Sequence, residues 1–144
     1  MADQHTTEKT GSCLCGAVKI LAKNVSNKAG ACHCDMCRRW AGGPFMAVDC
    51  GSDVSFEGED NLVTYSSSEW AERGFCKKCG SHLFYKIKET GQYIMAVGIF
   101  DDQDSFTFTH QVFIDEKPAY YSFANDTHNM TGAEVFSQFG SSDS

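Results

Sequence analysis

The chain alternates between short runs of apolar or alternating residues and clusters of Gly, Asn, Asp and Ser. Runs of about four to eight such residues, bounded by turn residues, are typical of β-strands. We therefore expect strands over residues 17–22, 45–50, 54–56, 62–66, 81–87, 92–99 and 106–114, paired in antiparallel sheets. Residues 23–30 are predicted to be a loop, because Asn, Ser and Gly are frequent there.

Two stretches favour helices instead. Residues 35–40 can form a helical turn before the Gly-Gly-Pro sequence at 42–44 ends it. Residues 131–139 place three apolar residues at helical spacing, namely Val135, Phe136 and Phe139. The predicted fold class is mainly β with one or two short helices. Eleven Phe and five Tyr agree with this prediction, because aromatic residues are enriched in strands.

Both ends of the chain are polar. Residues 1–10 have no apolar periodicity and residues 141–144 are an acidic serine tail, so we expect both to be disordered and one domain to span residues 11–140. The N-terminus lacks the apolar core of a signal peptide, and no window approaches the roughly 18 apolar residues of a membrane span. The sequence therefore predicts a cytoplasmic protein without a membrane partner.

The charge of the chain limits its partners. A formal net charge of −7 argues against nucleic acid, because phosphate binding needs clustered Lys and Arg that release counterions. An anionic small molecule would need a local basic patch. The candidates are Arg38-Arg39 and Lys77-Lys78, which lie beside cysteine motifs. The sequence gives no indication of the oligomeric state.

Seven of the eight cysteines fall into groups with the spacing of metal ligands. In a reducing compartment, clustered cysteines are metal ligands more often than disulfides. Cysteines two residues apart point to the same side of an extended chain and present two sulfurs to one ion, and thiolates in tetrahedral sites are typical of zinc. The groups are Cys13-x-Cys15, Cys32-His33-Cys34-x-x-Cys37 and Cys76-x-x-Cys79.

These cysteines can be divided between ions in two ways. In one, the first and third groups form a four-thiolate site and the middle group forms a three-thiolate site. In the other, the third group completes a site with Cys32 and Cys34, leaving Cys37 with the first group. The contiguity of the middle group favours the four-plus-three division. Four thiolates close a structural site, whereas three leave a fourth position open, as catalytic zinc requires.

The remaining candidates are single residues. Cys50 stands alone and is predicted to be a buried small residue rather than a redox thiol. His33 should face away from Cys32 and Cys34 and pack rather than bind metal. Three aromatic residues are expected in the core, namely Trp40, Phe45 and Trp70.

The two other histidines within the strand pattern, His82 and His110, are predicted to be hydrogen-bonded sheet residues. His110 is the one of these that we retain as a candidate for the metal site.

From about residue 11 to about 125, the chain resembles the glutathione-dependent formaldehyde-activating enzyme family, which includes centromere protein V. The resemblance rests on Gly11-x-Cys13-x-Cys15-Gly16-Ala17-Val18, Cys32-His33-Cys34-x-x-Cys37-Arg38, Arg73-x-Phe75-Cys76-x-x-Cys79-Gly80 and the stretch from His110 to Pro118. After that proline the chain has Ala119-Tyr120-Tyr121, where family members often carry a tryptophan.

The resemblance implies a zinc-stabilised fold of the β-tent type, which also occurs in a Rab-binding exchange chaperone and in methionine sulfoxide reductase B. It implies two Zn²⁺ ions per chain. A structural ion would lie on Cys13, Cys15, Cys76 and Cys79, and a catalytic ion on Cys32, Cys34 and Cys37.

The activity implied is that of a carbon–sulfur lyase or synthase. A thiol such as glutathione adds to a small aldehyde such as formaldehyde to give S-hydroxymethylglutathione, or the reverse reaction occurs. Arg38 or Arg39 would hold a carboxylate of glutathione. Two alternatives come from other classes of protein. One is a zinc-stabilised protein-interaction module without catalysis. The other is a redox enzyme, which would need Cys50 as its nucleophile, but the chain shows no recognisable second redox motif.

Overall fold

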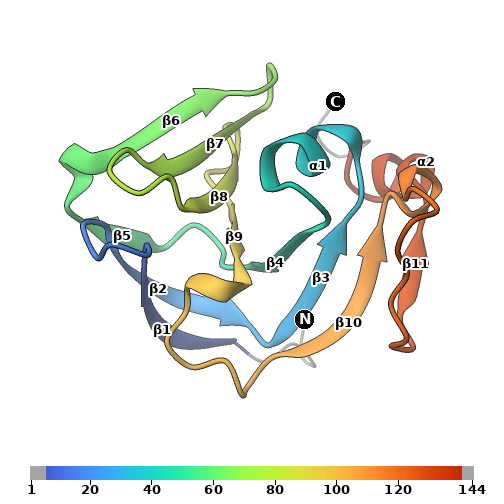
Figure 1. Ribbon diagram of the computed structural model, residues 1–144, viewed down its shortest axis with the longest axis horizontal. Coiled ribbons are helices and arrows are strands. Elements are labelled where there is room, and N and C mark those ends of the chain that lie inside the picture. Colours follow the sequence, from blue (N-terminus) through green and yellow to red (C-terminus); the bar gives the residue numbers. More distant parts are fainter. Residues whose placement is uncertain (1–5, 141–144) are drawn as a thin grey trace. The chain divides into compact units, whose positions relative to one another are not determined.

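The computed structural model describes residues 6–140, which divide into two compact units (Figure 1). The first unit contains residues 6–27 and 47–106, and the second contains residues 28–46 and 107–140. Each unit is described by itself. The single domain expected over residues 11–140 stays a prediction. The tail at 141–144 and the first five residues of the expected disordered leader lie outside the described residues.

The first unit contains a three-stranded antiparallel sheet in the order β1-β2-β5. Its strands are β1 (Thr6–Ser12), β2 (Lys19–Ser26) and β5 (Val54–Glu57). The expectation of disorder is wrong for residues 6–10, which pair with β2. Apolar periodicity is missing there because Lys9 is a buried residue of β1: its ammonium group contacts Asp102 at 3.0 Å and lies over the Phe106 ring.

The other strands of the first unit form an antiparallel series in the order β4-β9-β8-β7-β6. They are β9 (Tyr93–Ala96), β8 (His82–Ile87), β7 (Ala71–Cys76), β6 (Leu62–Ser66) and the last three residues of β4 (Phe45–Asp49). Two 3₁₀ turns, Glu59–Asn61 and Val97–Ile99, lie between strands. The Phe84 ring contacts Tyr93 edge-on at 4.8 Å and occupies the space that a side chain at Gly74 would fill.

The second unit is built on parallel strands, which the sequence pattern did not indicate. β10 (Thr107–Val112) lies between β3 (Lys28–Cys32) and β11 (His128–Met130) and is parallel to both (Figure 1). The predicted loop at 23–30 is wrong, because β2 continues to Ser26 and β3 begins at Lys28. The glycine in this stretch is needed for packing: a Cβ on Gly30 would lie 2.1 Å from Nε2 of His110.

Both predicted helices are present in the second unit. They are α1 (Asp35–Ala41) and α2 (Gly132–Val135), the latter followed by a π turn at Phe136–Gly140. A 3₁₀ turn at Ile114–Glu116 supports both N-termini. Within it, Glu116 accepts a hydrogen bond from the Asp35 N–H, and Asp115 accepts one from the Gly132 N–H, both at 2.8 Å.

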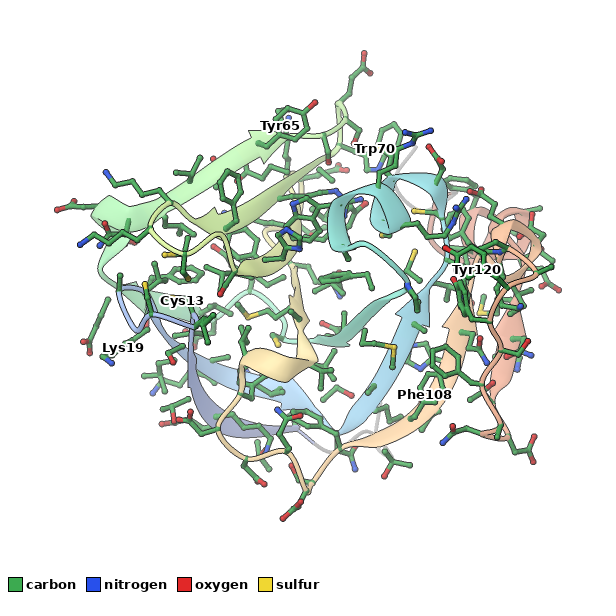
Figure 2. The ribbon with its side chains drawn as sticks, viewed as in Figure 1. Cys13, Lys19, Tyr65, Trp70, Phe108 and Tyr120 are labelled. Carbon is green, nitrogen blue, oxygen red and sulfur yellow. The ribbon has the colours of Figure 1, made fainter. Side chains whose placement is uncertain are left out.

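The aromatic residues predicted in the core divide into three cases. Phe45 is buried, and Trp40 is half-buried with its ring 5.3 Å from that of Phe45. The prediction is wrong for Trp70, which is 53% exposed at the end of the β6–β7 hairpin (Figure 2). Hydrophobicity alone suggested a core position, whereas the residue lies in the turn between β6 and β7.

Two candidate metal centres

Four cysteine sulfurs gather in the first unit. All Sγ atoms of Cys13, Cys15, Cys76 and Cys79 lie within 4.8 Å of one another. Cys13 and Cys15 are 3.7 Å apart, and Cys15 and Cys76 are 3.8 Å apart. A zinc–sulfur bond of about 2.3 Å places sulfurs of a tetrahedral site about 3.8 Å apart, whereas a disulfide bond is about 2.05 Å. The spacing fits a tetrahedral ion, and all eight cysteines are free.

Two tight turns present these sulfurs. Gly16 and Gly80 directly follow the last cysteine of each pair and have φ values of +82° and +78°, which favour glycine. Backbone amides donate to the sulfurs at the same turns, from Val18 to Cys13 at 3.3 Å and from Lys78 to Cys76 at 3.4 Å. Amide donors stabilise thiolates, so the turns are suited to metal ligands.

Ser81 connects the two turns. Its hydroxyl accepts from the Leu14 N–H at 2.9 Å and lies 3.2 Å from Sγ of Cys79. Hydrogen bonding with Ser81 lowers the pKa of Cys79 to about 5. The lowered pKa favours the thiolate of Cys79, which is the form that binds a metal ion.

Three cysteine sulfurs gather in the second unit. Cys32 ends β3, Cys34 is the N-cap of α1 and Cys37 lies in its first turn. Their Sγ atoms are within 4.8 Å of one another, and the Cys37 N–H lies 3.4 Å from Sγ of Cys34. We call these three residues the trithiolate cluster. Among residues 6–140, no fourth His, Cys, Asp or Glu belongs to this group.

The electrostatics of the trithiolate cluster favour a bound cation whenever its thiols are ionised. Hydrogen bonding with Cys34 and Cys37 raises the pKa of the Cys32 thiol, and burial raises it further. Three thiolates this close cannot all ionise without positive charge between them. Cys37 is buried and the other two are half-buried, so the donor set fits a soft metal ion such as zinc.

His33 faces away from the sulfurs, as predicted, and is fully buried. Its Nδ1 lies 2.8 Å from the Tyr121 hydroxyl, and its Nε2 lies 2.7 Å from Oε1 of Gln111. Burial lowers the pKa of His33, and the charges of Lys117 and Arg38 lower it further, while the hydrogen bond to Gln111 raises it. His33 is a packed, hydrogen-bonded residue outside both cysteine groups.

The two arginines proposed for substrate binding have different surroundings. Arg38 donates from Nε to the His33 carbonyl at 2.9 Å, and its Nη2 lies 3.9 Å from Asp35. Arg39 is 80% exposed and pairs with the same Asp35 at 3.0 Å. Of these two arginines, Arg38 is therefore the one held against the backbone between Cys32 and Cys34.

Three other candidates lie outside both cysteine groups. Cys50 is fully buried, and burial, together with the charge of Asp49, raises its pKa to about 12. His82 is half-buried on β8. His110 is also half-buried and its Nδ1 lies 2.8 Å from the Thr109 hydroxyl. Neither histidine belongs to a group of potential metal ligands within the described part of the chain.

Sequence reasoning missed Gln111 and Tyr121 as the hydrogen-bond partners of His33. Gln111 lies opposite Ala31 because β3 and β10 are parallel, and no local pattern announces that pairing. Tyr121 follows the 3₁₀ turn after β10.

These observations define a β-rich protein with two thiolate clusters that could each hold a metal ion. The family model described as glutathione-dependent formaldehyde-activating enzyme matches residues 8–116. The chain therefore belongs to the glutathione-dependent formaldehyde-activating enzyme family. No helix among the described residues is long and apolar enough to cross a membrane.

Individual relatives agree with this family. An uncharacterized lyase of Schizosaccharomyces pombe is 40% identical over 129 residues, which are 89% of this chain and 94% of the relative. A crystal structure of a Rhodobacter sphaeroides protein has a TM-score of 0.55 at 29% identity, and the match covers 64% of this chain and 87% of that chain. The family and the relative together indicate an enzyme of the lyase type.

Proposed function

We propose that this protein is a zinc-dependent carbon–sulfur lyase that joins a thiol such as glutathione to a small aldehyde such as formaldehyde, or separates them. The observation that carries the proposal is the trithiolate cluster, which supplies three soft ligands and no fourth from the described residues. Family membership supports the chemistry, and the lyase name of the fungal relative supports its class.

The reaction is balanced without a further reactant. A bond forms between the thiol sulfur and the aldehyde carbon, the carbonyl π electrons move to oxygen, and that oxygen carries the proton that the thiol has lost. When bound at the trithiolate cluster, zinc would supply a position at which the pKa of an incoming thiol falls towards neutrality. The reverse reaction returns the same proton to the thiol.

The residues of the chain have separate roles in this proposal. Cys32, Cys34 and Cys37 bind the catalytic ion, while Cys13, Cys15, Cys76 and Cys79 bind a structural ion. Arg38, held in place by the His33 carbonyl, is favoured over the exposed Arg39 for a substrate carboxylate. An ordered guanidinium loses less entropy on binding, because its side chain is already fixed.

Metal analysis and calorimetry test the proposal. We expect about two zinc equivalents per chain, and glutathione should bind much more tightly than S-methylglutathione, which has no free thiol. About one equivalent of zinc with four reactive thiols would contradict the two-site assignment. Equal binding of the two peptides would place glutathione away from the trithiolate cluster or show a closed site, as expected for an interaction module.

Turnover is measured by exchange NMR between formaldehyde hydrate and its glutathione adduct. The zinc-loaded protein should accelerate exchange, and Arg39→Gln should retain more of the acceleration than Arg38→Gln. Without acceleration by the wild type, the proposed chemistry is wrong even if glutathione binds.

A further inference from the structure

The strand β6 lies at the end of its antiparallel series and pairs with β7 on one side (Figure 1). No strand among residues 6–140 pairs with its other edge. Thr64, Tyr65 and Ser66 are exposed, and Tyr65 is 63% exposed (Figure 2). The outer edge of β6 therefore presents main-chain groups and an aromatic ring to solvent.

Edge strands are usually protected against pairing with another chain by charges, proline or bulges. The other edge strands of the first unit have such features, since β1 has a bulge at Glu8, and β5 has four residues and ends in Glu57. In contrast, β6 contains neither a charged residue nor a proline, and it pairs with β7 without a bulge. This unprotected edge is the one best suited to pair with a further strand.

The pairing with β7 determines which main-chain groups of β6 face outward. The Asn61 carbonyl accepts a hydrogen bond from the Lys77 N–H at 2.8 Å, so the main chain of Asn61 faces β7. Residues two apart in an antiparallel strand direct their main-chain groups to the same side, so those of Val63 and Tyr65 face β7 as well. The main-chain groups of the residues between them face away from β7.

The outward-facing groups are self-complementary. They are the N–H and carbonyl groups of Thr64 and Ser66 and the carbonyl of Leu62, whose N–H already donates to the Glu59 carbonyl. In an antiparallel pair of β6 strands centred on Thr64, the two Thr64 residues donate to each other, and each Ser66 N–H donates to the Leu62 carbonyl of the other copy. This register uses the full length of the strand.

The charges at the two ends of β6 are complementary in an antiparallel pair. At the C-terminal end, the Lys88 ammonium group lies 2.6 Å from the Ser66 hydroxyl. At the N-terminal end, exposed Glu59 and Asp60 precede the strand. Antiparallel pairing brings the acidic end of each copy beside the lysine of the other. Glu69, in the hairpin turn, is a like charge at the lysine end, so we expect a weak dimer rather than a permanent one.

We propose that the outer edge of β6 binds a second copy of this chain, in a symmetric dimer whose two β6 strands pair antiparallel about Thr64. Tyr65 of each copy lies opposite Val63 of the other, and aromatic and β-branched residues form favourable cross-strand pairs. Both copies use the same surface, so the assembly closes at a dimer. Stable interfaces bury about 1,600 Å², and a five-residue strand is short by that measure, so the dimer forms reversibly at high protein concentration.

Sedimentation velocity of the zinc-loaded protein over a series of concentrations tests the proposal. The mass should rise from the 15.9 kDa of the monomer to twice that value, without larger species. Thr64→Pro removes an outward N–H but no hydrogen bond to β7, so this variant should stay monomeric at every concentration. Thr64→Val keeps the N–H and is the matched control, which should still dimerise. A monomeric wild type, or a Thr64→Pro variant that dimerises as the wild type does, would overturn the proposal.

Charge reversal tests the same interface without changing the main chain of β6. Lys88→Glu should weaken the dimer, because it faces the acidic end of the other copy, and adding Asp60→Lys to the same chain should restore it. Within one chain, the strand from Leu62 to Ser66 separates the two positions by about 13 Å, so restoration requires contact between copies. Additive weakening by the two substitutions would overturn the proposed register.

Amide hydrogen exchange, followed by NMR, measures the register residue by residue. In the wild type, exchange at the N–H groups of Thr64 and Ser66 should become slower as the protein concentration rises. The N–H groups of Val63 and Tyr65 face β7 and should be protected at every concentration. If exchange at Thr64 and Ser66 does not depend on concentration while the protein dimerises, the dimer contact lies elsewhere and the proposal is wrong.

Discussion

The surroundings of each cysteine decide its chemistry in this chain. Cys79 lies beside the Ser81 hydroxyl, and hydrogen bonding lowers its pKa to about 5. Cys50 is fully buried, and burial, together with the charge of Asp49, raises its pKa to about 12. One side chain is therefore ready to bind a metal ion at neutral pH, whereas the other remains a protonated thiol that packs like a small apolar residue.

Cys50→Ser tests this assignment. The variant should keep its zinc content, glutathione binding and turnover, and its free energy of unfolding should fall by about 1–3 kcal/mol, because a hydroxyl group is buried in place of the thiol. Urea denaturation measures the stability, and exchange NMR measures turnover. A folded variant without turnover would instead support a redox or catalytic role for Cys50.

Single residues were predictable where the information was local. The spacing of the cysteines indicated both groups, and the alternation of an extended chain indicated that His33 faces away from the sulfurs. The partners of His33 were not predictable, because Gln111 is 78 residues away and Tyr121 is 88 residues away. The pairing of β10 with β3 brings Gln111 to His33, and neither strand's sequence specifies that pairing. Tyr121 lies in the segment that follows β10.

At the scale of elements, α1 has a well-defined end. Gly42 adopts φ +83° and donates its N–H to the Arg38 carbonyl at 2.8 Å. Gly42→Ala should reduce the free energy of unfolding by roughly 1–2 kcal/mol, the cost of a Cβ in the left-handed region. No atom lies within 4 Å of the added Cβ, so the cost is conformational. Urea denaturation measures the change.

The adjacent glycine supplies the control for this experiment. Gly43 also has open space around it, and its φ is not positive. Gly43→Ala should therefore change stability much less than Gly42→Ala. Equal effects of the two substitutions would show that the left-handed conformation of Gly42 at the end of α1 is not the cause of the loss of stability.

The parallel pairing of β10 and β11 predicts a pH dependence of stability. Burial lowers the pKa of His110, and His128 opposite it and Lys28 on β3 lower it further. The unfolded chain then binds a proton near pH 6.5 more readily than the folded chain does. The resulting stability is present above about pH 6.5 and is lost as the pH falls towards the lower pKa of the folded state.

His110→Gln should therefore lose less stability than the wild type between about pH 7.5 and 5.5. Urea denaturation at a series of pH values measures the difference, and contributions from the cysteines cancel in the comparison. His128→Gln removes one of the charges that face His110 and should reduce the slope to a smaller extent. If the free energy of unfolding changed with pH equally in His110→Gln and the wild type, His110 would not be the source of this pH dependence.

Most elements were predictable because strands and helices have local signals. Short runs between turn residues gave most of the strands of the first unit, and the Gly-Gly-Pro sequence marked the end of α1. The failure at residues 23–30 has a physical cause, since Gly30 is small to admit His110 rather than to form a turn. The parallel direction of β3, β10 and β11 depends on distant segments and has no local signal.

At the scale of the whole molecule, the two cysteine groups differ in what they connect. Cys15 and Cys76 are separated by 61 residues, so an ion there closes a long loop, and its binding free energy contributes to folding. Structural zinc contributes about 10–16 kcal/mol in small modules, comparable with the roughly 5–15 kcal/mol of a whole domain. Cys32, Cys34 and Cys37 are close in sequence, and an ion there restrains only a short segment.

We therefore expect Cys76→Ser to give an unfolded or insoluble chain, and Cys37→Ser to remain folded with one zinc but without glutathione binding or turnover. Circular dichroism, metal analysis and calorimetry on both variants test this difference. If Cys37→Ser unfolds while Cys76→Ser folds and binds glutathione, the structural and catalytic roles of the two groups are reversed.

The parallel pairing of β3 with β10 also sets an order of events during synthesis. The trithiolate cluster leaves the ribosome long before Gln111 and Tyr121, because 88 residues separate His33 from Tyr121. At about 5–20 residues per second, this interval lasts roughly 4–18 s. Throughout it, β3, which carries Cys32, lacks its partner strand β10. Stalled nascent chains that end before Thr107 should therefore be alkylated at these cysteines, whereas completed, zinc-loaded chains should be protected.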